Sequence, residues 1–217
     1  MLGHRLVERT GPELAVQEVL YGFVMALTFI IAARAGIFTY DTPWNLVMMI
    51  LAMNFVWGAI DMIIFYRIDV STQRRYTRIL KEDRRADGYR EKIDGELDNT
   101  IFDVLTEDDR QKGVDVVIDG TIESERDIWS DRKRMFQSSA ACFIITVATA
   151  IPVIAALLLI DDQTAALDAA AVLASVSLFF VGCNIDREAS KGIRLAEGLS
   201  IMALALMLSL FAAYFGG

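Results

Sequence analysis

An acidic residue, Asp61, lies inside a long apolar segment, 45–66, where its carboxylate is placed to bind a cation. Asn54 lies two helical turns earlier on the same face, and Met62 adjoins Asp61. An ionisable group within a membrane is costly, and by default it faces the interior of a helix bundle and marks a pathway. A carboxylate beside a thioether suits a borderline divalent metal such as Fe²⁺ better than Ca²⁺ or Mg²⁺. We therefore predict a metal site at Asp61, Met62 and Asn54.

Met25 adds a ligand to this predicted site from another apolar segment, where it lies with Tyr21 and Thr28 along a mildly polar stripe. Two simpler interpretations stay open. Methionine in a membrane protein commonly fills gaps in the packing. Asp61 lies near the polar end of its segment, so its side chain is also placed to reach the membrane interface.

A second group of carboxylates recurs at every fourth residue in the polar part of the chain. Its members are Asp115, Asp119, Glu123, Asp127 and Asp131. In one helix this spacing places neighbours on one face, where each pair of like charges costs about 0.3 kcal/mol. Divalent cations would compensate, because they take clustered carboxylate oxygens, and we predict metal ligands at Asp115, Asp119 and Glu123. Solvation, together with nearby basic side chains, is the alternative.

The elements that must position these residues are helices that cross a membrane. Of the 217 residues, 54% are hydrophobic, and the mean hydropathy is +0.40. The apolar residues form blocks of about 20, the length that spans a hydrocarbon core roughly 30 Å thick. A segment in lipid must satisfy its own backbone hydrogen bonds, which predicts helices. The five predicted spans are 18–38, 45–66, 137–160, 164–183 and 195–215.

Charge and composition exclude several classes of protein. A net charge of -8 and a pI near 4.7 provide no basic surface for nucleic acid. Two cysteines and one histidine form neither a disulfide framework nor a Cys/His zinc cluster. The sequence has no nucleophile–base pair and no phosphate-binding loop, so we predict that the protein is not an enzyme and has no tightly bound cofactor.

The distribution of Lys and Arg predicts the orientation. Apart from Arg34, all of them lie before the first span, in 67–136 or between the last two spans. Because positive residues stay in the cytoplasm, we predict a cytoplasmic N-terminal segment, 1–17, and a cytoplasmic insert, 67–136. The C-terminus is expected on the opposite side, and the membrane is expected to be the plasma (inner) membrane. Arg34 and Asp168 lie near the outer ends of two spans, and we expect them to pair, since each alone would be costly.

The insert is predicted to be helical. Its first part continues the second span, with a break near Gly95, and apolar residues at helical spacing follow in 96–105. Thr106 followed by Asp109 is typical of a helix start. From there a helix is predicted from about 107 to 131, continuing into the third span. The insert is longer than a connection needs, which favours a partner or a ligand.

Short motifs in this arrangement resemble those of the vacuolar iron transporter (VIT) family. Two spans, a helical insert and three further spans are that family's order. The stretch GAIDMIIFYRIDVSTQ, 58–73, is similar to the end of the family's second helix, G-A-x-S-M-x-x-G-E-Y-x-S-x-x-x-Q. The Ile-Pro at Pro152 and the stretch LFFVG, 178–182, are also similar. The resemblance covers about 15–217.

The resemblance implies a dimer that exchanges Fe²⁺ or a similar metal for protons. In the family, an Asp of the first helix and Glu and Met of the second line the ion path at the dimer interface, and the insert gathers metal. This sequence departs from that pattern. Met25 stands where the family has Asp, and Phe65 and Tyr66 replace its Gly-Glu pair. Asp61, where the family has Ser, would restore one carboxylate.

We therefore expect an all-α integral membrane protein, with five transmembrane helices in 18–66 and 137–217 and a helical cytoplasmic insert between helices two and three. Its expected partners are membrane lipid and a second copy of the chain. The expected function is export of Fe²⁺ or Mn²⁺ from the cytoplasm against protons. Asp61 would also carry the proton, because burial favours a neutral carboxyl group. The alternative is a non-transporting scaffold or sensor whose acidic insert binds a protein partner or metal.

Overall fold

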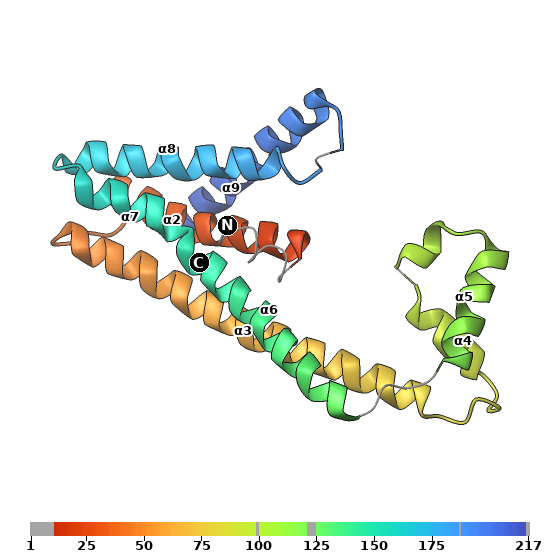
Figure 1. Cartoon of the computed structure of the whole chain (residues 1–217). Helices are drawn as coiled ribbons and strands as arrows, with labels where there is room; N and C mark the ends of the chain where they lie inside the picture. The colour runs from red at the N-terminus through yellow and green to blue at the C-terminus, as the bar shows by residue number, and fades with distance from the viewer. Residues whose placement is uncertain (1–10, 99, 121–124, 187, 216–217) are drawn as a thin grey trace. The chain divides into compact units, whose positions relative to one another are not determined.

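The computed structural model describes residues 11–98, 100–120, 125–186 and 188–215, and all regular structure within them is helical. Five spans in this part of the chain are long and apolar enough to cross a membrane, which confirms the predicted all-α membrane architecture (Figure 1). They are formed by α2 (Pro12–Arg34), α3 (Pro43–Leu80), α6 (Glu125–Ala148) with α7 (Ala150–Leu159), α8 (Gln163–Gly182) and α9 (Lys191–Phe215).

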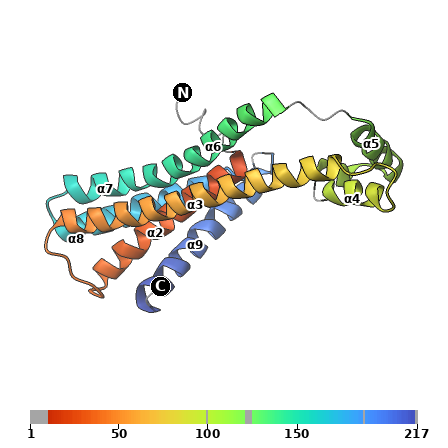
Figure 2. The same cartoon turned by 90° about the horizontal axis from the view of Figure 1, so that it is seen from below.

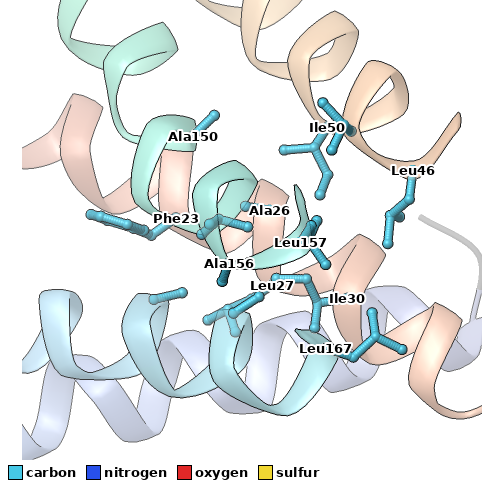
Figure 3. Packing of buried hydrophobic residues seen from close by; sticks show 14 of the residues in the cluster. Phe23, Ala26, Leu27, Ile30, Leu46, Ile50, Ala150, Ala156, Leu157 and Leu167 are labelled. Atoms are coloured by element: carbon cyan, nitrogen blue, oxygen red, sulfur yellow. The ribbon is translucent and has the colours of Figure 1, made fainter. Parts of the chain in front are cut away.

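The chain divides into two compact units. The membrane unit comprises Met1–Phe65 and Phe136–Gly217, and the polar unit comprises Tyr66–Met135. In the membrane unit, α2 packs against α7, α8 and α9, and α8 packs against both α7 and α9 (Figures 1 and 2). The side chains of this core include Leu27, Ile30 and Leu157, all buried (Figure 3). Because lipid is as apolar as these residues, their contribution comes from close packing more than from leaving water.

The first helix begins and ends earlier than the predicted span, 18–38. Pro12 opens α2, where its missing N–H is not needed. The helix ends at Arg34 because Gly36 adopts a left-handed conformation, with φ +69°, which stops the helix at little cost for glycine. The consequence is that Glu18 lies within the span, between apolar residues, and not at its edge.

Two glycines let α8 and α9 approach closely. A Cβ atom added to Gly182 would lie 2.7 Å from Gly198 Cα, and one added to Gly198 would lie 2.8 Å from the carbonyl oxygen of Phe179. Small residues at such crossings allow backbones to pack directly, which is a common device between membrane helices.

The predicted pair of Arg34 and Asp168 is confirmed. Arg34 Nε donates to Asp168 Oδ1 at 2.8 Å, and Nη2 lies 3.5 Å from Oδ2, so α2 and α8 are joined near their ends.

We expect Arg34→Ala and Asp168→Ala each to lower the midpoint of thermal unfolding in detergent. Their double mutant should lose less than the sum, because the second change removes a partner already lost. Additive losses would contradict the coupling.

The polar unit has a small core of its own. Helices α4 (Tyr89–Glu96) and α5 (Glu107–Asp119) pack together (Figure 2), and Ile93 and Val114 are buried in the core that they form. Arg110 holds the chain around this core by donating to three carboxylates, those of Asp94, Asp98 and Asp103. The hydrogen bonds to Asp98 and Asp94 raise the pKa of Arg110, so its charge is retained at any physiological pH.

Three details of the predicted insert are wrong. The break after α3 falls at 81–88, where Gly88 has φ +78°, and not near Gly95, which lies inside α4. The apolar spacing of 96–105 forms a 3₁₀ turn, η1 (Ile101–Val104), in place of a helix. The predicted helix 107–131 is interrupted, because α5 ends at Asp119 and the extended backbone of Gly120 leaves the helix.

The start of α5 is as predicted. The side chain of Thr106 accepts a hydrogen bond from the backbone N–H of Asp109 at 3.3 Å, which caps the helix. The cytoplasmic location of the polar unit stays a prediction.

Candidate cation site in the membrane unit

A fully buried carboxyl group, that of Glu18, lies inside the membrane unit. The residue has 0% exposure, on the second turn of α2. Its Oε2 is hydrogen-bonded to the hydroxyl of Thr146 on α6. Its Oε1 is buried and has no hydrogen-bond partner among the described residues. A buried charge of this kind is costly, so a carboxyl group held here is a strong indicator of function.

Glycines on two helices make room for this contact. A Cβ atom on Gly22 of α2 would overlap the side chain of Thr149. A Cβ atom on Gly58 of α3 would lie 3.4 Å from Thr146 Cβ and 3.1 Å from the ring of Phe143. Helices α2 and α3 therefore both approach α6 closely at Thr146, and α2 brings Glu18 with it.

Helix α3 adds two polar groups on the face that contains Gly58. Asn54 is fully buried one turn before it, and its Nδ2 donates to the carbonyl oxygen of Ile50 at 2.9 Å. The amide oxygen of Asn54, like Glu18 Oε1, has no hydrogen-bond partner in the described part of the chain. Asp61 follows Gly58 by about one turn and is half-buried. Its carboxyl group is close enough to that of Glu18 for the two to interact electrostatically.

The hydroxyl of Thr146 has one proton and two neighbouring acceptors. Besides Glu18, its Oγ1 lies 3.0 Å from the carbonyl oxygen of Cys142. A single O–H satisfies only one of them at a time. Both hydrogen bonds form together when Glu18 is protonated and donates to Thr146, which then donates to Cys142. The geometry therefore accommodates a neutral, proton-bearing Glu18.

The site that results is built from oxygen atoms. Two carboxyl groups, one amide oxygen and one hydroxyl come from three helices, and two of the buried acceptors have no donor within the described part of the chain. Among the described residues, no three or more of His, Cys, Asp and Glu are grouped to hold a metal, so a bound cation would rely on the amide oxygen as well. Oxygen ligands of this kind suit Mn²⁺, Mg²⁺ or Ca²⁺, and Fe²⁺ if a softer ligand joins.

The other predicted ligands lie in two different places. Met25 and Met62 are half-buried in the membrane unit, and Met25 lies two turns after Glu18 on the same face of α2. In the polar unit, the carboxylate of Asp115 accepts from Arg90 Nη1 at 2.5 Å, and Asp119 is the exposed last residue of α5. Glu123 lies outside the described residues. The metal-binding roles of these residues stay predictions, but the acidic series does not share one helix.

Glu18 and Thr146 are the members of the site that the sequence prediction missed. The predicted span began at Glu18, so the residue was treated as an edge. A signal was present, because Ala15 and Val16 continue the apolar pattern before Glu18 and Pro12 is placed to begin the helix. Thr146 carries no comparable signal, since threonine is common in membrane helices.

Comparisons of this chain with models of known families, with curated proteins and with solved structures find no match. The resemblance to the VIT family therefore depends on the short motifs alone and stays a prediction.

Proposed function

We propose that this protein is a secondary transporter that moves a divalent cation, Fe²⁺ or Mn²⁺, across the membrane in exchange for protons. The observation that carries the proposal is the fully buried Glu18, one oxygen of which has no hydrogen-bond partner among the described residues, together with the electrostatic interaction between its carboxyl group and that of Asp61. Two carboxylates in a membrane repel each other unless a cation or a proton lies between them. Exchange of a cation for protons requires at least one site that binds the cation and the proton in turn.

In the cation-bound state, Glu18 and Asp61 are both ionised and hold the metal together with the amide oxygen of Asn54. This set favours Mn²⁺ as it stands, and the thioether of Met25 or Met62 would extend it to Fe²⁺. When the metal leaves, a proton returns to Glu18, which then donates to Thr146. The charge within the membrane stays low in both states, which limits the cost of each.

A second candidate function, a scaffold or sensor, is supported by the surface of the polar unit. Val104 and Val116 are 82% and 73% exposed there, so both side chains are available for contact with a protein partner. Several of the unit's acids are already neutralised, as Asp115 is by Arg90. This leaves fewer carboxylates for metal.

The test is flux into vesicles that contain the purified protein and a metal-quenched dye. We expect Fe²⁺ or Mn²⁺ to quench the dye faster with an opposing pH gradient, and Asp61→Asn to lose this quenching. Asp41→Asn is the matched control, because it removes the same charge from an exposed residue outside the spans. Unchanged flux in Asp61→Asn would refute the site. A folded wild-type protein without flux for either metal would favour the scaffold or sensor.

A further inference from the structure

We infer that the polar unit has a binding pocket for phosphate groups between α3 and α6, and that a phosphate of an anionic lipid headgroup or of a soluble compound occupies it. The inference does not depend on the proposed transport. Two cavities of about 550 and 500 Å³ lie here, and they share Val70, Arg74 and Arg132 as lining residues. They therefore form one continuous recess along the polar end of α3.

The recess is strongly basic. Arg78 and Lys81 line one cavity, Arg67 lines the other, and Arg74 and Arg132 line both. Guanidinium groups present paired N–H donors that match the oxygen atoms of phosphate, so several arginines around one cavity are the expected design for that ligand. The hydroxyl of Ser71, also in the lining, adds a further donor.

The acids near the recess are engaged elsewhere. Glu82 is the acidic lining residue, and its carboxylate forms an ion pair with Lys92 at 2.5 Å. Asp131 accepts a hydrogen bond from Gln73 at 3.1 Å and lies 3.4 Å from Arg134. Helix α3 and the residue directly after it contribute four basic side chains to the lining of the recess, those of Arg67, Arg74, Arg78 and Lys81. No carboxylate of the described residues forms an ion pair with any of these four. These four exposed side chains are therefore available to an anion.

The recess begins where the apolar part of α3 ends. Arg67 directly follows the apolar segment 45–66 in the same uninterrupted helix, and Arg74 lies about 10 Å farther along it. Headgroups occupy roughly the first 6 Å beyond the hydrocarbon core, so Arg67 lies at their depth and Arg78 and Lys81 lie beyond it. Basic pockets at this depth bind anionic headgroups. The deeper residues are placed for a second phosphate, or for a soluble phosphorylated ligand.

The test compares ligands on the full-length protein in detergent. We expect native mass spectrometry to show phosphatidylglycerol bound about tenfold more tightly than phosphatidylcholine, because choline cancels the charge of the phosphate. Arg74→Gln, which alters both cavities, should remove most of this preference. Arg85→Gln is the matched control, since Arg85 is an exposed arginine of the same unit that does not line the recess.

A calorimetric titration with inorganic pyrophosphate distinguishes the two sources. Pyrophosphate that binds and displaces phosphatidylglycerol would identify a soluble phosphorylated compound as an occupant, whereas lipid binding without pyrophosphate binding would identify the headgroup. The proposal is overturned if the folded wild-type protein shows neither lipid preference nor pyrophosphate binding. It is also overturned if Arg74→Gln and Arg85→Gln weaken binding equally, since general surface charge would then explain it.

Discussion

Replacing Glu18 by glutamine is expected to reduce cation flux to the level of empty vesicles while the protein stays folded. Glutamine has nearly the same volume as glutamate and still forms a hydrogen bond with Thr146, so the packing around α2 and α6 is retained. It has no negative charge for a divalent cation and no proton to exchange, and the remaining carboxyl group, Asp61, neutralises only half of the metal's charge. The measurement is dye quenching by Mn²⁺ or Fe²⁺ in vesicles, with and without a pH gradient.

Two further variants make this result specific. Glu188→Gln removes a carboxylate from an exposed residue outside α8 and α9 and should transport like the wild type. Thr146→Val keeps the shape of the side chain and removes the hydroxyl. It should change the pH dependence of flux more than the maximal flux, because it removes the hydrogen-bond partner of Glu18 and none of the three groups proposed to hold the cation, Glu18, Asp61 and Asn54. Wild-type transport by Glu18→Gln would exclude Glu18 from the ion path, whatever Asp61→Asn does.

Replacing Gly198 by valine is expected to cost about 3 kcal/mol of folding free energy, the largest effect on stability that we foresee for a single substitution. The new Cβ atom would lie 2.8 Å from the carbonyl oxygen of Phe179, and backbone has no rotamer by which to move aside. Helices α8 and α9 must therefore separate along their crossing. The measurement is the midpoint of thermal unfolding in detergent, followed by tryptophan fluorescence.

Gly192→Val is the matched control, on the first turn of the same helix. A Cβ atom there has nothing within 4 Å, so valine should change the midpoint by little. Both variants make the same change of residue type in the same helix, so the comparison isolates the contact at the crossing. Equal midpoints for the two variants would show that the α8–α9 crossing is looser than the structure has it.

The sequence by itself determined the features that depend on local composition. Hydropathy is a sum along one segment, so all five spans were predicted without knowledge of their neighbours. The cap at Thr106 depends on residues three apart. The pair of Arg34 and Asp168 was also predictable, although the residues are distant in sequence, because two lone opposite charges at the same depth in a membrane have few other partners.

Only the tertiary structure decided which polar residues are buried, and against what. Glu18 is fully buried because α2 and α3 pack closely on α6 at two glycines, and its partner, Thr146, lies far away in sequence. Asp61, the residue that the sequence prediction emphasised, is only half-buried. The predicted acidic face was lost at Gly120, where the chain leaves the helix. Burial of a polar group depends on which side chains come opposite it from other helices, and no pattern within a single segment contains that information.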